Sequence, residues 1–294
     1  MTKQHISIFM ELRNKNMSLK QIQLRVMFFL LLGLFLVTLN SAELKMATTT
    51  STDNTGLLDV IAPLYKKDFG VDLKWISVGT GNALKLGENC DVDVVFVHAP
   101  ELEKKFVADG FGVDRTPVMY NDFVILGTPE LKAKFEGKTI KEAFEIIKKE
   151  QIKFVSRGDN SGTHSKEKSV WESVMGDVPS KEKWYIEAGQ GMIATINIAN
   201  EQRGLTLSDR GTYIKYESNY KGNPPLVIVL EGDTNLNNYY SIMAVNPKNC
   251  PKADYRGATN FIKWIVSPKI QQSIADFKLL DKQLFTPDAH SRKE

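Results

Sequence analysis

From about residue 44 to the end of the chain, short apolar runs alternate with longer amphipathic segments. Residues 92–97 form a nearly continuous apolar run, which is typical of a buried parallel strand. Residues 56–66 instead carry apolar side chains at helical spacing. These two patterns predict strands at 44–50, 71–78, 92–97, 123–126, 153–155, 226–230 and 241–245. They predict helices at 56–66, around 83, and at 101–108, 140–149, 166–175, 193–202, 261–266 and 270–277.

This order of elements predicts an α/β fold. Strands that alternate with helices form mainly parallel sheets covered on both faces. The 294 residues are enough for two lobes of about 100–150 residues each. No internal repeat or low-complexity stretch interrupts the pattern, so we expect two α/β lobes.

The most apolar segment, residues 26–39, lies near the start of the chain. It follows Lys20 and Arg25 and precedes the small or polar residues 40–42. A basic flank, a short apolar run and a small-residue exit define a secretory signal peptide. A membrane-spanning helix needs about 20 apolar residues, so a retained anchor is the less favoured alternative. No cysteine follows the run, and we therefore expect a periplasmic protein without a lipid anchor; Met17 is an alternative initiator.

Removing this leader changes the charge of the protein. The whole chain has a formal net charge of +3. Residues 1–42 hold five basic residues and one acid, so 33 basic and 34 acidic residues remain in the mature chain. Nucleic-acid binding requires a concentrated basic surface, and this balance argues against it.

Cys90 and Cys250 are the only cysteines. Two cysteines can pair in an oxidising compartment, and their spacing does not match a zinc site. A disulfide and two free thiols both remain open at this point.

Polar residues gather at two turns that each follow a predicted strand and precede a predicted helix. The first turn, Thr48–Gly56 (TTTSTDNTG), has five consecutive Thr or Ser residues. The second turn, Ser77–Asn82 (SVGTGN), has two glycines that let backbone N–H groups approach a ligand. It is not a dinucleotide fingerprint, because position 84 is leucine where a third glycine is needed.

The third turn, Arg157–His164 (RGDNSGTH), combines a guanidinium, two hydroxyls and two glycines before a helix. Helix N-termini expose unpaired N–H groups, and arginine can make paired hydrogen bonds to an oxyanion. Asp159 either orients Arg157 or caps the helix, and Asp53 of the first turn is expected to be a cap. Helix caps and solvated loops would explain each turn alone. Together they predict a site for one dianion at the carboxyl ends of the strands.

These motifs resemble those of the TupA-type tungstate-binding proteins, the solute receptors of tungstate importers. The family is marked by TTTS, VGTG and RGDxSGT segments, which stand here at Thr48–Ser51, Val78–Gly81 and Arg157–Thr163. Residues 91–99, 120–123 and 207–210 are similar too, so the likeness covers most of residues 44–285.

The resemblance implies a two-lobed periplasmic-binding-protein fold of the type II, clam-shell kind, with a mixed, mostly parallel sheet in each lobe. The expected parts are a leader at 1–42, a first lobe at 43–126 and 239–294, and a second lobe at 127–238. The implied ligand is tungstate, with molybdate as a second candidate. No cofactor is expected, and the tungsten would be bound as the oxyanion through hydrogen bonds and not through metal ligands. The protein is expected to be a monomer that delivers the anion to the permease of an ABC importer. The implied contacts are Thr49 or Thr50, Ser51, Thr80, Arg157, Ser161, Gly162 and Thr163.

Three other functions were weighed against this one. Phosphate receptors share the Arg-x-Asp-x-Ser-Gly-Thr pattern, but phosphate keeps a proton at neutral pH and needs a carboxylate to accept it. An exported hydrolase would need more than Ser161 and His164 in one loop, which lack a nucleophile elbow. A periplasmic sensor or scaffold would use the same cleft, and its sequence pattern would be the same as that of a transport receptor.

Overall fold

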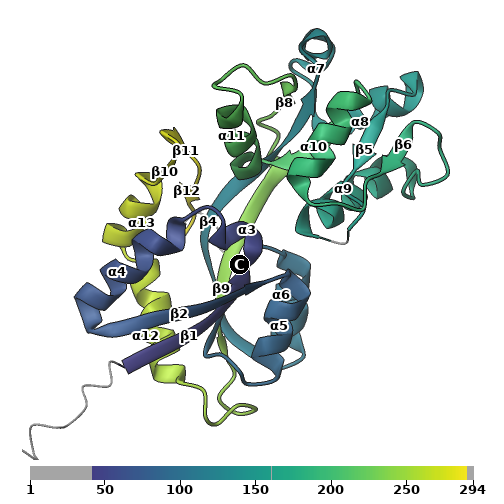
Figure 1. Ribbon diagram of the computed structural model, residues 1–294. Helices are drawn as coiled ribbons and strands as arrows, with labels where there is room; N and C mark the ends of the chain where they lie inside the picture. The colour runs from purple at the N-terminus through teal and green to yellow at the C-terminus, as the bar shows by residue number, and fades with distance from the viewer. Residues whose placement is uncertain (1–41, 160, 290–294) are drawn as a thin grey trace, which may run out of the picture. The chain divides into compact units, whose positions relative to one another are not determined.

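The computed structural model describes residues 42–159 and 161–289, which form an α/β unit with two lobes (Figure 1). Except for Ala42, the expected leader lies outside the described residues. In the first lobe, the sheet order is β12-β4-β9-β3-β1-β2. Its strands are β1 (Ala42–Thr49), β2 (Val71–Val78), β3 (Val94–Val97), β4 (Gly112–Gly127), β9 (Asn237–Val245) and β12 (Thr286–Pro287).

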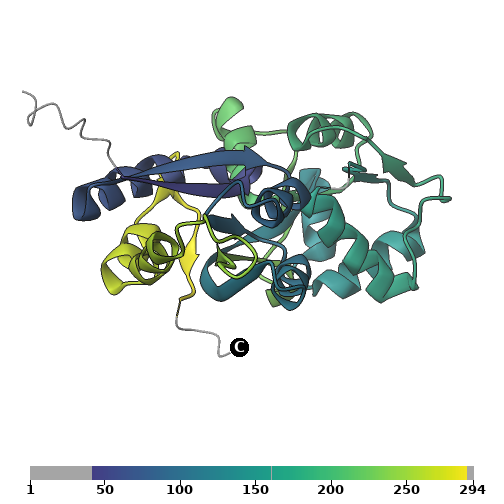
Figure 2. The same cartoon turned by 90° about the horizontal axis from the view of Figure 1, so that it is seen from below.

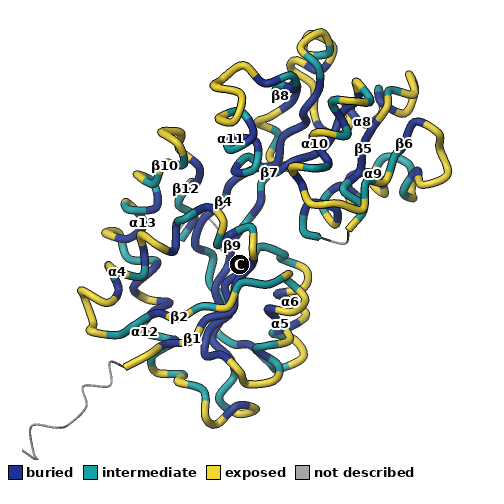
Figure 3. Tube along the Cα trace, viewed as in Figure 1, coloured by how far each residue is buried: buried dark blue, intermediate teal, exposed yellow. Residues whose placement is uncertain are grey.

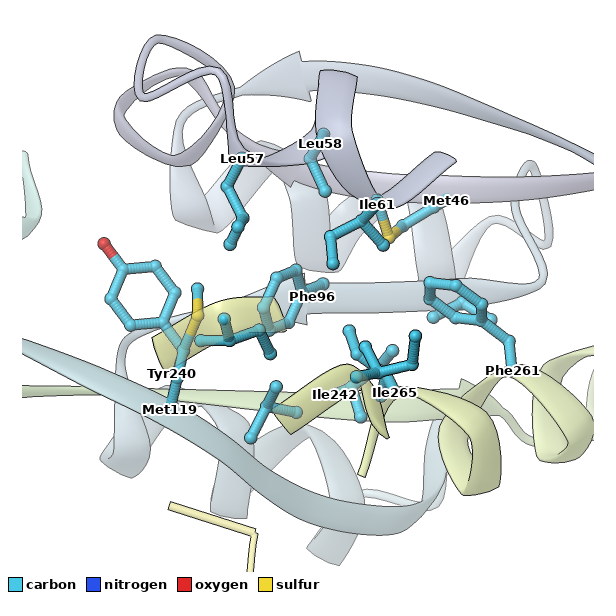
Figure 4. Close-up of a cluster of buried hydrophobic side chains, with 14 of the residues drawn as sticks. Met46, Leu57, Leu58, Ile61, Phe96, Met119, Tyr240, Ile242, Phe261 and Ile265 are labelled. Carbon is cyan, nitrogen blue, oxygen red and sulfur yellow. The ribbon is translucent and has the colours of Figure 1, made fainter. Parts of the chain in front are cut away.

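Helices cover both faces of this sheet, as the apolar strands require. On one face, α4 (Leu57–Phe69) packs together with α12 (Tyr255–Ile265) and α13 (Pro268–Ala275). The C-terminal helices therefore lie beside elements from the start of the fold (Figure 2). Figure 4 shows Leu57, Leu58 and Ile61 of α4 and Phe261 of α12 meeting at the sheet. The other face carries α5 (Thr80–Glu88) and α6 (Pro100–Ala108).

The second lobe is built from α8 (Ile140–Glu150), α9 (Gly162–Met175), α10 (Met192–Glu201) and α11 (Arg210–Asn219) around short strands. These strands are β5 (Phe154–Ser156), β6 (Tyr185–Glu187), β7 (Thr206–Asp209) and β8 (Val227–Leu230). Trp171 of α9 is fully buried, with its ring 4.2 Å from Phe144 and 5.4 Å from Phe154. This aromatic cluster packs α9 against β5, and the third turn lies between these two elements.

Short elements complete the fold. They are α3 (Thr50–Asp53), η1 (Pro129–Leu131), α7 (Lys132–Phe135), η2 (Thr234–Leu236) and the hairpin β10–β11 (Lys278–Leu279 and Lys282–Gln283). In the described part of the chain, every helix is too short or too polar to cross a membrane.

The strands β4 and β9 connect the two lobes. Residues 112–122 of β4 pair with β9, and residues 123–127 pair with β7 and β8. Both strands are largely buried (Figure 3). The lobe boundaries expected at residues 126 and 238 stay a prediction, because β4 belongs to the sheets of both lobes.

The sheets are mixed, but the expectation that they are mostly parallel is wrong around these connecting strands. β1 pairs in parallel with β2 and β3, and β5 with β6. The ladders of β4 with β9, β7, β8 and β12, and of β3 with β9, are antiparallel. A strand that leaves a lobe and a strand that returns to it run in opposite directions, and side by side they pair antiparallel.

Cys90 and Cys250 form a disulfide in the first lobe. Cys90 follows the C-terminus of α5, and Cys250 lies between β9 and α12. The bond closes a loop with a sequence separation of 160 residues, so it ties the outgoing part of the first lobe to the returning part.

Replacing both cysteines with serine should lower the free energy of unfolding by about 2–5 kcal/mol, because the unfolded chain gains the entropy of the opened loop. The disulfide lies at the opposite end of α5 from Thr80, so anion affinity should not change. Urea unfolding and anion titration of the double variant measure both quantities. Weaker anion binding by the folded double variant would contradict this separation.

Candidate anion-binding site

The first turn begins where β1 ends. Thr49 is the N-cap of α3, and its Oγ1 accepts a hydrogen bond from the Thr52 N–H at 3.2 Å. The same oxygen lies 2.7 Å from Thr52 Oγ1 and 3.0 Å from Ser51 Oγ. Thr49 is buried, so its hydroxyl belongs to this internal network. Thr50 is exposed and Ser51 partly exposed, which leaves these two as the accessible hydroxyls among the first-turn candidates.

His98 joins this network, although the sequence analysis did not select it. It follows β3, the neighbour of β1 in the sheet. Its Nε2 lies 3.0 Å from Ser51 Oγ and 3.1 Å from Thr49 Oγ1, and its Nδ1 lies 2.9 Å from Asn238 Oδ1. Burial lowers the pKa of the imidazole, and the Asn238 hydrogen bond opposes this only in part. A single histidine is not part of a sequence motif. Its position directly after a predicted buried strand was the one signal in the sequence that could have marked it as a site residue.

Asp53 is not a helix cap, contrary to the sequence prediction. Its carboxylate accepts hydrogen bonds from Trp75 Nε1 at 2.7 Å and from Ser77 Oγ at 2.8 Å. Both donors lie on β2, which leads into the second turn. Asp53 therefore ties the first turn to the second.

The second turn opens α5 without a side-chain cap. Gly79 is the N-cap and makes no side-chain hydrogen bond, and Thr80 is the first helical residue. Thr80 is partly exposed, and Gly81 has no atom within 4 Å of the place where a Cβ would stand. The N-terminal N–H groups of α5 are thus open to an anion.

The third turn has a more ordered arrangement. Ser161 is the N-cap of α9, and its Oγ accepts a hydrogen bond from the His164 N–H at 3.3 Å. Asp159 Oδ1 accepts from the Ser161 N–H at 3.0 Å, while Asp159 Oδ2 lies 2.8 Å from Arg157 Nε in an ion pair. Gly158 has a φ of +65°, a conformation that favours glycine. Asp159 therefore orients Arg157, one of the two roles expected for it, and does not cap α9.

The pKa of Asp159 is lowered. Burial alone would raise it, but the hydrogen bonds from Ser161 and the charge of Arg157 outweigh burial. Asp159 is thus a carboxylate at neutral pH, and its two oxygens already have partners.

A buried acid beneath the third turn was also missed by the sequence analysis. Glu167 of α9 accepts hydrogen bonds from Tyr185 OH at 2.6 Å and from Ser156 Oγ at 2.7 Å. Burial raises its pKa to about 7, despite these bonds and one from the Arg157 backbone N–H. Glu167 connects α9 to the end of β5 and the start of β6, and it supports the backbone that carries Arg157.

The first and third turns meet at His98. A Cβ placed on Gly162 would lie 3.3 Å from His98 Cε1, so the N-terminus of α9 lies against the edge of the imidazole ring. In addition, Lys215 of α11 donates a hydrogen bond to the Asn54 carbonyl oxygen of the first turn. The structure thus brings Ser51 and Thr49 close to Gly162 through His98. Ser161 and Gly162 are partly exposed beside it, whereas Thr163 is buried.

This arrangement suits an anion. The 14-residue helix α9 and the nine-residue helix α5 each point an N-terminus at a candidate turn. Over residues 42–159 and 161–289, no group of three or more His, Cys, Asp or Glu could hold a metal ion. The available donors are hydroxyls, backbone N–H groups and one guanidinium.

Comparisons with known proteins agree with this fold. Residues 38–269 match the family described as a PBP superfamily domain. The chain is 59% identical over 244 residues to the tungstate-binding protein TupA of Campylobacter jejuni, covering 83% of this chain and 90% of that one. The structure of TupA from Desulfovibrio alaskensis G20 matches with a TM-score of 0.82 and 56% identity, over 85% of this chain and 100% of the other. A structure described as the tungstate ABC transporter from Geobacter sulfurreducens matches with a TM-score of 0.69 and 50% identity, over 80% and 98%.

The chain therefore belongs to the periplasmic binding protein (PBP) superfamily, whose fold has two lobes. Within that superfamily it belongs to the family of TupA tungstate-binding proteins. The sequence resemblance and the expected two-lobed α/β fold are both confirmed. These relatives are named as binding proteins, in line with the expectation that the chain is not an enzyme.

Replacing Glu167 with Gln should remove part of the pH dependence of stability. The pKa of Glu167 is about 7 in the folded protein, above the value of 4.5 expected in the unfolded chain. The folded state therefore holds this proton more tightly, and its stabilising effect is full below pH 4.5 and lost as the pH rises through 7. Up to about 3 kcal/mol is involved.

Urea unfolding of the wild type and of Glu167→Gln between pH 5 and 8 measures this effect. The wild type should lose more stability over that range than the variant. Parallel curves for the two proteins would show that Glu167 does not titrate there.

Proposed function

We propose that this protein captures tungstate, and also molybdate, in the periplasm and delivers the anion to the permease of an ABC importer. The relatives named tungstate-binding proteins support the ligand, and the expected signal peptide supports the compartment. The permease is the partner implied by that family, and we expect a monomer. The lobes would close over the anion by a hinge at β4 and β9, with the first lobe at 43–126 and 239–294 and the second at 127–238.

The observation that carries this proposal is the pairing of three aspartates: Asp53 in the first turn, Asp159 in the third turn, and Asp209, which acts on His98. Asp53 accepts hydrogen bonds from Trp75 and Ser77, and Asp159 from Ser161 beside its ion pair with Arg157. Asp209, the N-cap of α11, accepts bonds from the Thr212 N–H at 2.8 Å and the Thr212 hydroxyl at 2.7 Å. None of the three is positioned as a free acceptor for a protonated anion.

This pairing favours tungstate and molybdate over phosphate. The two metal oxyanions are fully deprotonated at neutral pH, and they need only donors. A buried dianion must be compensated by hydrogen bonds and opposite charge. Phosphate keeps one proton at neutral pH, and each of these three carboxylates already accepts hydrogen bonds from the protein.

We assign the contacts as follows. In the first turn, Thr50 and Ser51 are favoured over Thr49, whose hydroxyl is held in the cap of α3. In the second turn, Thr80 is the proposed contact. The third turn contributes Arg157, Ser161, Gly162 and Thr163, with Arg157 as the only formal positive charge of the set.

The anion should stabilise the folded protein. A ligand at 100 times its dissociation constant adds about 2.7 kcal/mol. At about 2–4 °C per kcal/mol for a chain of this size, the unfolding midpoint should rise by several degrees. We expect this shift with micromolar tungstate or molybdate in phosphate-free buffer.

Phosphate and sulfate at the same concentration are the controls and should shift the midpoint little. A shift with phosphate alone would move the protein to the phosphate receptors. The absence of a shift with every one of these anions would refute the proposed function.

Replacing Arg157 with Ala should weaken tungstate binding by about 2–5 kcal/mol, because a desolvated charge pair with the anion is lost. This corresponds to a dissociation constant about 30-fold higher or more. Arg157→Lys should recover only part of the affinity, since the planar fork is replaced by a point charge. Calorimetric titration measures each value.

Arg256→Ala is a matched control, because Arg256 is an exposed arginine on α12. Its affinity should equal that of the wild type. Equal affinity of Arg157→Ala and the wild type would rule out Arg157 as an anion ligand.

A further inference from the structure

We propose that His98 is a positioning residue that connects the lobe-crossing strands β4 and β9 to the anion-binding hydroxyls of the first turn. It would act as a neutral ring with its hydrogen on Nδ1. The inference rests on the proposed oxyanion function, and it adds a residue outside the set of expected ligands.

The connection begins with two buried asparagines. Asn121 of β4 and Asn238 of β9 face each other in the antiparallel ladder, and each is 5% exposed. Asn238 Nδ2 donates to Asn121 Oδ1 at 2.8 Å and lies 3.3 Å from Tyr240 OH. Because the amide nitrogen of Asn238 is used in this way, its oxygen faces His98.

This asparagine fixes the protonation of the ring. His98 Nδ1 lies 2.9 Å from Asn238 Oδ1, an atom that can only accept a hydrogen bond. Nδ1 must therefore carry the hydrogen, and in a neutral ring Nε2 is then an acceptor. The polarity of Nε2 is thus set by a residue on the connecting strand β9.

Nε2 in turn orders the hydroxyls. It lies 3.0 Å from Ser51 Oγ and 3.1 Å from Thr49 Oγ1, and it accepts one hydrogen from this pair. Thr49 Oγ1 also accepts the Thr52 N–H and lies 2.7 Å from Thr52 Oγ1. Without an acceptor at Nε2, the hydroxyl that donates to it would lose this partner, and the first turn would meet the anion with its hydroxyl hydrogens in several arrangements.

The ring itself has little freedom to move. It stacks on Tyr240 with centroids 4.7 Å apart and an interplanar angle of 26°. Its Cε1 lies against Gly162 of α9, where a Cβ would approach to 3.3 Å. On its backbone side, Glu103 accepts the Ala99 N–H at 2.7 Å and pairs with Arg115 at 2.8 Å. Asp209 is the charged group that acts on the ring from the second lobe.

A purely structural histidine would satisfy the same hydrogen bonds, so the test must separate affinity from stability. His98→Asn keeps an amide near the Nδ1 position but removes the acceptor near Ser51. His98→Gln instead extends an amide toward Ser51 and Thr49. We expect the tungstate dissociation constant to rise at least 10-fold in His98→Asn and to recover part of that loss in His98→Gln.

Trp264→Phe serves as the stability control, because it removes the 2.9 Å hydrogen bond from Trp264 Nε1 to Asp68 outside the site. It should lower the unfolding midpoint and leave the dissociation constant unchanged. If both His98 variants bind tungstate as tightly as the wild type does, the positioning role is overturned.

A second measurement uses the wild type and does not depend on any variant folding. Nitrogen-15 spectra of the imidazole rings in the unliganded wild type at pH 7 should show His98 as the Nδ1–H tautomer. A charged ring or an Nε2–H tautomer in the wild type would refute the proposal. If the wild type binds no oxyanion, the proposed function fails, whereas normal wild-type binding with unaffected variants defeats only the role of His98.

Discussion

The central constraint on this molecule is the desolvation of a doubly charged anion. Removing such an ion from water is costly unless the protein surrounds it with directed donors and a compensating charge. In the proposed site, helix N-termini, hydroxyls and Arg157 would meet this need. Asp53 in the first turn accepts hydrogen bonds from Trp75 and Ser77, and the charge of Asp159 in the third turn is compensated by its ion pair with Arg157.

The architecture follows from the same constraint. Donors from two lobes must converge, yet the anion must be able to enter and leave. The shared strands β4 and β9 let each lobe keep its own core while the turns face one another. The disulfide lies within the first lobe and the aromatic cluster around Trp171 within the second, so each lobe is stiffened separately. The proposed hinge motion would therefore be confined to the connecting strands.

Many of the helices and strands were predictable from local sequence patterns. Strand β2 at residues 71–78 and the start of α8 at residue 140 agree with the predictions, because their apolar spacing or cap residues are clear. The full extent of β4, from residue 112, was missed, since its first half mixes polar residues with Pro117. β7 and α11 were missed because their sequence is polar and their burial comes from packing on β4.

In the site, too, local features were predictable and long-range contacts were not. Contiguous motifs revealed the three turns, but the partners of each side chain depend on residues distant in sequence. Asp53 looked like a cap because Trp75 and Ser77 are not local to it. His98 and Glu167 had no motif at all, and only the fold shows that they support Ser51 and Arg157.

The most direct test of the account is a crystal structure of the protein grown with tungstate, with anomalous diffraction measured at the tungsten absorption edge. The account predicts one strong anomalous peak, with its oxygens within hydrogen-bonding distance of the first, second and third turns, including the guanidinium of Arg157. A peak elsewhere, or one that contacts the turns of a single lobe, would contradict it.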